Sequence, residues 1–215
     1  MDKPDNLSLQ GGSSMSVRIL TFVLASVLAG AVATSAQTSR AKAAPAKTPA
    51  ATAQPGQTSP GTGPVIVVET EKGTFEFETY PNEAPKTVAH IIGLVNKRFY
   101  NGQRVHRVVP GFVIQMGDPA TRDMTKQAAW GSGGSGTPVG AAEISKTRTH
   151  VRGAVAMAHA GDAAKADSQF YVTLADVHRL DADYTVFGKV ISGMDVVMKI
   201  AQPDRIVRVT VRGAK

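Results

Sequence analysis

The residues most able to do chemistry lie close together between Arg104 and Pro119, in the segment RVHRVVPGFVIQMGDP. Its central Pro-Gly dipeptide is typical of a turn, and the runs on either side predict two strands. Because side chains alternate between the faces of a strand, Arg107 and Gln115 are expected on a common surface, with Phe112 or Val113 beside them unless a bulge shifts the register. That surface would offer hydrogen-bonding groups next to an apolar wall. On spacing alone, the arginine could also be a snorkelling or salt-bridged side chain.

The sequence argues against several other kinds of functional site. The chain of 215 residues has no cysteine, which excludes disulfides, thiolate metal ligands and a cysteine nucleophile. The run from Gly131 to Gly136 lacks the Lys-Ser/Thr pair of a phosphate-binding loop and is expected to be a flexible surface loop. A hydrolase triad built on Asp118 and His106 would lack the Gly-x-Ser-x-Gly elbow. Lysines and arginines form no stripe interleaved with aromatics, so nucleic acid is not an expected partner. No metal site is expected, because no paired ligand spacing joins the histidines at positions 90, 106, 150, 159 and 178.

The elements that must hold these residues are mostly short strands. VIVVET from Val65 and TFEFETY ending at Tyr80 predict a hairpin. A helix is predicted from Pro85, because an apolar stripe follows at Val88, Ile91, Ile92 and Val95. Further strands are expected at 104–109, 112–116, 154–158, 170–174, 185–191 and 206–211, and a second helix at about 194–201. Many short strands with only two helices favour a mainly β fold, an antiparallel sheet closed as a barrel or sandwich with helices over its open ends.

The segment around Arg107 also resembles a family signature. VHRVVPGFVIQMGD is similar to the FHRVI-PGFM-QGGD of the cyclophilins, which are peptidyl-prolyl isomerases. GAVAMAHAG from Gly153, DSQFYVTL from Asp167 and RLDADYTVFGKVISGMDVV from Arg179 follow in the family's order. They resemble its G-x-L-S-M-A-N-A-G, G-S-Q-F-F-I-T and L-D-G-x-x-x-V-F-G-x-V-x-G-M-D-V-V. The resemblance covers about Val65 to Val211 and implies a closed antiparallel β-barrel capped by two α-helices.

The resemblance implies a role for each site residue. Arg107 matches the catalytic arginine, Gln115 the glutamine that hydrogen-bonds the substrate backbone, and Phe112 an aromatic wall of the proline pocket. The other substrate-binding residues would be His106 beside the arginine, Val113, Tyr171 and Leu180 in the pocket, Tyr184 at its rim, and Ala158, His159 and Gln169 along the strip that pairs with the substrate. The implied reaction is non-covalent, arginine-assisted cis-trans isomerisation of X-Pro bonds in proline-containing polypeptides, without cofactor or metal, by a monomer.

Some positions depart from the family pattern. Val105 and Val113 replace a frequent phenylalanine and methionine, which leaves a smaller pocket wall. His159 replaces an asparagine. Arg179 stands where cyclosporin-sensitive members carry tryptophan, so we expect weak binding of that drug. A binding module, in which the same groove docks a partner with little turnover, is the competing interpretation, and the retention of Arg107 with its neighbours favours the enzyme.

The chain ahead of Val65 predicts export. After Arg18 an uncharged run from Ile19 to Ser39 is typical of a secretory signal that begins at about Met15, with cleavage after Ala33 or, by preference, Ala36. Residues 1–36 would form the signal region, residues 37–64, rich in Ala, Pro and Thr, a disordered linker, and residues 65–215 the isomerase domain. The expected location is the periplasm, without stable membrane insertion after cleavage. The alternative is a chain anchored by the uncleaved segment.

Overall fold

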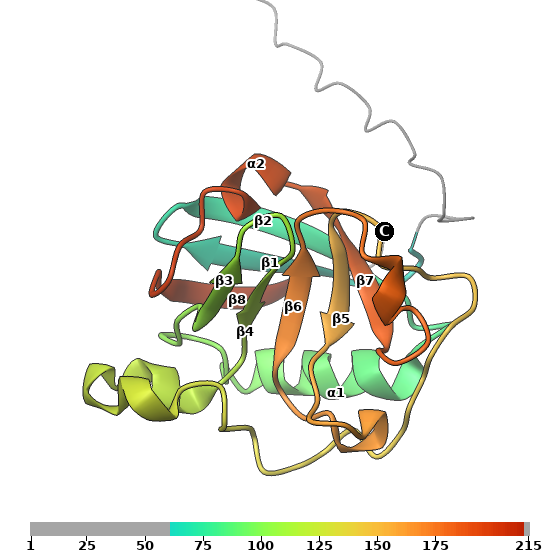
Figure 1. Cartoon of the computed structure of the whole chain (residues 1–215), viewed down its shortest axis with the longest axis horizontal. Coiled ribbons are helices and arrows are strands. Elements are labelled where there is room, and N and C mark those ends of the chain that lie inside the picture. Colours follow the sequence, from blue (N-terminus) through green and yellow to red (C-terminus); the bar gives the residue numbers. More distant parts are fainter. Residues whose placement is uncertain (1–60, 213–215) are drawn as a thin grey trace, which may run out of the picture. The chain divides into compact units, whose positions relative to one another are not determined.

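Residues 61–212 are described by a computed structural model, in which eight strands form one antiparallel sheet (Figure 1). The predicted signal peptide and linker up to residue 60 lie outside the described residues. Neighbouring strands follow the order β3-β4-β6-β5-β7-β2-β1-β8. The strands are β1 Val65–Thr70, β2 Gly73–Thr79, β3 Arg107–Val109, β4 Val113–Met116, β5 Ala154–Met157, β6 Phe170–Thr173, β7 Val186–Ser192 and β8 Ile206–Arg212.

The sheet curls into a half-barrel whose two edge strands, β3 and β8, share no continuous ladder. The chain just before β3 reaches the start of β8 through single backbone bonds: Gly102 N donates to the Ile206 carbonyl at 2.9 Å and Val105 N to that of Asp204 at 2.9 Å. The mainly β, antiparallel fold and the hairpin of β1 and β2 are confirmed. A third bond runs from Ile206 N to the Gln103 carbonyl at 2.8 Å, and Arg104 forms an isolated bridge with Arg205. The closed barrel expected from the sequence is therefore a half-barrel, and residues 104–106 lie outside β3, which begins at Arg107 and not at Arg104 as predicted.

Alternation along β4, β5 and β6 separates two apolar clusters. The larger cluster fills the inside of the half-barrel, and the smaller one covers the outer face of the same strands. Inward-facing residues are Ile114, Met116, Val155, Met157, Phe170 and Val172, and outward-facing ones are Val113, Ala154, Ala156 and Tyr171. Because both faces of these strands are covered, their apolar residues are buried on both sides, and the outer cluster supplies the floor of a surface site.

Two α-helices lie on the sheet, α1 Pro85–Asn96 and α2 Met194–Val197. Helix α1 begins at the predicted proline, and in place of a local cap the Glu143 carboxylate accepts the amides of Lys86 at 3.0 Å and Thr87 at 2.9 Å. Helix α2 is shorter than predicted because its hydrogen bonds change from i→i−4 to i→i−3 after Met198. Four 3₁₀ helices complete the elements: η1 Pro119–Arg122, η2 Met124–Ala129, η3 Ala163–Lys165 and η4 His178–Leu180.

The described chain begins a few residues before the first strand. Gly63 N donates to the Thr79 carbonyl at 3.2 Å, and Thr79 Oγ1 donates to the Pro64 carbonyl at 2.7 Å, so the end of the predicted linker lies against β2. Within residues 61–212, no helix has the length and apolar character that crossing a membrane requires.

Candidate active site

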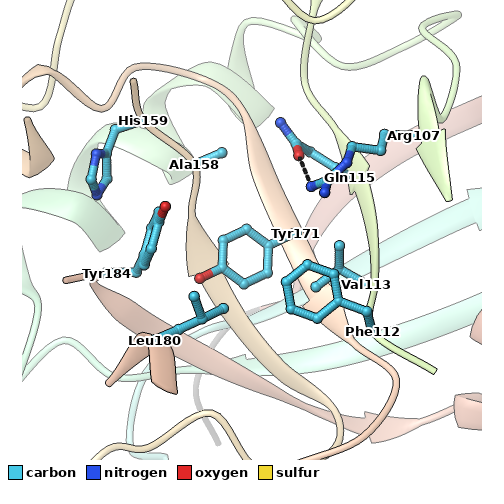
Figure 2. Close-up of a pocket in the computed structure, with 9 residues that line it drawn as sticks. All are labelled: Arg107, Phe112, Val113, Gln115, Ala158, His159, Tyr171, Leu180 and Tyr184. Carbon is cyan, nitrogen blue, oxygen red and sulfur yellow. Dashed lines mark hydrogen bonds between the residues drawn. The ribbon is translucent and has the colours of Figure 1, made fainter. Parts of the chain in front are cut away.

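A pocket of about 200 Å³ opens on the outer face of the sheet (Figure 2). Strands β3, β4 and β6 carry part of its lining, and the turn before β4, the chain after β5 and the segment around η4 carry the rest. Its lining consists of Arg107, Phe112, Val113, Gln115, Ala158, His159, Tyr171, Leu180 and Tyr184. The structure thus brings together every site residue predicted from the sequence except His106 and Gln169.

Arg107 and Gln115 face one another across the β3–β4 pair, where they are register partners. Arg107 Nη1 donates to Gln115 Oε1 at 3.2 Å, and Gln115 Nε2 donates to Gln169 Oε1 at 2.9 Å. Gln169 in turn donates its Nε2 to the carbonyls of Gly131 at 2.9 Å and Gly133 at 2.8 Å. Because those carbonyls accept only, the Gln169 amide has one favourable orientation, and it fixes the orientation of the Gln115 amide. Gln169 lines the neighbouring hollow and acts here through Gln115.

The glycine-rich run at 131–136 is anchored, contrary to the flexible loop expected from the sequence. The buried Asp118 carboxylate accepts the amides of Gly131 at 2.6 Å and Gly133 at 3.2 Å. Asp167 accepts those of Ser135 and Gly136, both at 2.9 Å. A Cβ at Gly133 would lie 2.3 Å from Asp118 Oδ1, so the close approach of the carboxylate requires glycine there. The anchored loop holds the carbonyls that orient Gln169.

The far wall of the pocket is aromatic. The ring of Tyr184 lies 5.8 Å from that of Tyr171 in an edge-on arrangement, and the His159 ring stacks on Tyr184 at 4.4 Å. His159 Nε2 also hydrogen-bonds the Asp183 carbonyl at 2.9 Å. His159, which stands where the family has asparagine, therefore packs against Tyr184 at the rim of the pocket.

A buried hydrogen-bond network lies behind Tyr171. Its hydroxyl is 2.8 Å from His150 Nε2, and His150 Nδ1 is 2.7 Å from Asp181 Oδ1, which also accepts the His150 amide at 2.7 Å. His178 Nδ1 lies 2.9 Å from the other oxygen of Asp181. Since Asp181 directly follows η4, the network ties the segment carrying Leu180 to β6. Sequence reasoning missed His150 and Asp181, because no local pattern distinguishes them.

Burial and hydrogen bonding set the protonation states of this network. Burial lowers the pKa of His150, against the opposing effect of Asp181, so the imidazole is neutral at pH 7. Partial burial acts to raise the pKa of Asp181, but hydrogen bonds from His150 and His178 outweigh it and hold that pKa below its usual value. Burial raises the pKa of the Tyr171 hydroxyl, which remains protonated.

His106 lies beside Arg107 in the sequence but outside the pocket. Its side chain is buried and lines a neighbouring hollow with Trp130, and burial lowers its pKa. The imidazole is therefore neutral at pH 7 and lies beside the pocket and not in its lining. Among residues 61–212, no cluster of three or more histidine, aspartate or glutamate side chains could hold a metal ion.

Two guanidinium groups flank Phe112 at the pocket mouth. Arg107 Cζ lies 5.7 Å and Arg179 Cζ 4.5 Å from the centre of its ring. Both arginines are exposed. Arg107 gives one of its five N–H groups to Gln115 and makes no other hydrogen bond to residues 61–212, so four donors remain for a bound molecule.

The curled antiparallel sheet presents the hydrogen-bonded pair Arg107 and Gln115 beside an apolar pocket, and the lining holds no serine, threonine or cysteine. Such a site offers hydrogen bonds and an apolar surface to a bound peptide. The match of residues 65–213 to the model of the cyclophilin-type peptidyl-prolyl cis-trans isomerases makes this specific: the chain belongs to that family. It is a peptidyl-prolyl cis-trans isomerase acting on proline-containing peptides, and the enzyme interpretation is preferred over the binding module.

Two curated relatives support this family assignment, and a solved structure shows the same fold. The chain is 39% identical over 171 residues to a probable peptidyl-prolyl cis-trans isomerase of Brucella abortus, covering 72% of this chain and 87% of that protein. It is 39% identical over 139 residues to peptidyl-prolyl cis-trans isomerase B of Bacillus subtilis, covering 65% of this chain and 91% of that protein. The crystal structure of a Cryptosporidium parvum cyclophilin-type isomerase superimposes with a TM-score of 0.61 at 23% identity, over 71% of this chain and 99% of that one, and shares the fold.

Proposed function

We propose that Arg107 accelerates X-Pro rotation by a hydrogen bond made at the transition state, and that the clients are proteins folding after export. The observation that carries the first part is the Arg107–Gln115 pair at the edge of an apolar pocket. The second part rests on the signal-like run from Ile19 and the Pro-rich segment after it.

The chemistry follows from amide resonance. The X-Pro bond has a rotational barrier of about 18–20 kcal/mol, because rotation removes the partial double bond. In the twisted state the proline nitrogen regains a lone pair, which accepts a hydrogen bond from a fixed N–H donor. Arg107 provides that donor at any physiological pH. Since the planar ground state offers no lone pair, the bond forms only at the transition state and raises kcat.

The arginine does not account for the whole acceleration. One well-placed donor contributes about 3–4 kcal/mol by analogy with oxyanion holes, whereas a million-fold acceleration needs about 8 kcal/mol. The remainder comes from holding the proline ring against Phe112, Val113, Tyr171 and Leu180 while Gln115 and backbone groups bind the chain on the rotating side. The buried network behind Tyr171 keeps these walls in place before the substrate arrives.

An isomerisation assay with the purified protein and its Arg107→Ala variant tests the arginine mechanism. Exchange NMR on a proline peptide measures catalysed cis-trans rates directly. We expect a fast wild type and a variant slower by about a hundredfold or more. Equal, fast rates would show that Arg107 has no role in the chemistry, and equal, slow rates would favour a docking function for the groove.

Export is tested separately. Labelling the amino terminus of the protein recovered from cells should place it after Ala33 or Ala36, with the protein in the periplasmic fraction. An intact terminus in the membrane fraction would favour the uncleaved anchor, and an intact terminus in the cytoplasm would refute export.

A further inference from the structure

The mouth of the pocket carries two arginines without acidic partners. Among residues 61–212, neither Arg107 nor Arg179 forms an ion pair. The carboxylate nearest to Arg179 in the sequence, that of Asp181, is hydrogen-bonded to His150 and His178. Uncompensated positive charge at the edge of a groove attracts negative charge in whatever binds there.

Arg179 packs on Phe112 at this mouth. Its guanidinium carbon lies 4.5 Å from the centre of the Phe112 ring, and among residues 61–212 its N–H groups make no hydrogen bond. The planar fork of N–H donors of an arginine can bind a carboxylate through two parallel hydrogen bonds. Because the ring already orders the side chain, binding costs less conformational entropy than at a freely mobile surface arginine.

Arg179 lies next to the pocket, on the side of Phe112. Arg179 and the pocket residue Leu180 are neighbours in η4, and Phe112 lies on the opposite side of the pocket from Ala158 and His159 (Figure 2). If the proline ring occupies the pocket and one arm of the substrate pairs with the strip at Ala158, the other arm leaves on the opposite side, over Phe112. The second arm brings a residue next to the proline within reach of Arg179.

We propose that Arg179 is a specificity-determining residue that selects clients with an acidic side chain adjacent to the proline. This inference rests on the proposed isomerisation of peptides in this pocket and specifies the class of sequence that the pocket prefers. The aspartate or glutamate carboxylate binds the guanidinium of Arg179 and tightens binding of the chain without taking part in the rotation, while Arg107 stays available for the proline nitrogen.

The test compares peptides that differ only in one charge. Two matched pairs, Ala-Ala-Pro-Glu-Ala with Ala-Ala-Pro-Gln-Ala and Ala-Glu-Pro-Ala-Ala with Ala-Gln-Pro-Ala-Ala, place the carboxylate on either side of the proline. Exchange NMR gives kcat/KM, and peptide titration gives Kd, for wild type, Arg179→Gln and Lys97→Gln. The last variant removes the same charge from an exposed lysine that lines none of the hollows around the pocket.

In one of the two pairs, wild type should favour the glutamate peptide roughly two- to fivefold in kcat/KM and Kd at low salt. The preference should disappear in Arg179→Gln and at about 1 M salt, where the screening length is about 3 Å, and persist in Lys97→Gln. No preference in either pair, or a preference that survives in Arg179→Gln, would overturn the proposal. If no peptide is isomerised, the proposed function fails, and the Kd comparison still decides whether Arg179 selects acidic sequences.

Discussion

Replacing Gln169 by glutamate tests how the Arg107–Gln115 pair is oriented. In the wild type, Gln169 donates to two loop carbonyls and accepts from Gln115, which leaves Gln115 Oε1 facing Arg107. An ionised carboxylate cannot donate, and would place negative charge at 2.8 and 2.9 Å from the carbonyl oxygens of Gly133 and Gly131. The Gln169→Glu side chain must then turn away or take up a proton, and Gln115 loses its fixed orientation.

The size of the effect follows from the bonds at stake. Each neutral hydrogen bond contributes about 1 kcal/mol net, and water can replace part of the loss because the loop carbonyls are only partly buried. A cost of about 1–2 kcal/mol in the orientation of Gln115 and Arg107 corresponds to roughly a 5- to 30-fold fall in kcat/KM at pH 8. At low pH the protonated carboxyl group can donate to one carbonyl and still accept from Gln115, so part of the activity should return.

Exchange NMR on a proline peptide between pH 5 and pH 8 gives the required profile. Gln169→Leu, which lacks donors and acceptors, should be slow at every pH, and Gln127→Glu, an exposed glutamine outside the groove, should behave as wild type. Urea unfolding of each variant separates loss of activity from loss of fold. Wild-type kcat/KM for Gln169→Glu at pH 8 would refute the role of Gln169 in orienting the pair.

Two further predictions concern the pocket rim and the buried histidines. Because Arg179 replaces the family's tryptophan and covers Phe112, cyclosporin should bind only weakly by calorimetric titration, and Arg179→Trp should tighten it; a submicromolar Kd for the wild type would contradict this. Burial lowers the pKa of His150 and His106 from the ordinary value of 6.5, so the unfolded chain binds more protons and the free energy of unfolding should fall as pH drops below about 6.5. Urea titrations at pH 8 and pH 5.5 should show a smaller fall for His150→Gln, and an unchanged fall would show that His150 is not the titrating group.

Periodicity predicted the parts of the fold that depend on local pattern. The alternation between Arg107 and Gln115 across a Pro-Gly turn anticipated their register pairing, and the proline at position 85 marked the start of α1. These two predictions succeed because side chains repeat every two residues along a strand and every 3.6 residues along a helix. The residues that share a face of one element therefore follow from their positions in the sequence alone.

Long-range contacts were beyond such reasoning. Glu143 caps a helix that begins 58 residues earlier, Asp118 holds the loop at Gly131, and His150 joins Asp181 to Tyr171. Each depends on how distant loops fold over the sheet, and no period in the sequence reports it. The incomplete closure of the barrel has the same origin, because single bonds between residues 102–105 and 204–206 replace a ladder.

The central claim is that Arg107 acts on the twisted amide and not on the planar substrate. Arg107→Lys keeps the charge and shortens the donor, so it separates attraction of the substrate from stabilisation of the transition state. Saturation kinetics by exchange NMR should show a kcat about a hundredfold lower with KM nearly unchanged. A raised KM with an unchanged kcat would show instead that Arg107 only binds the peptide, and would contradict the mechanism.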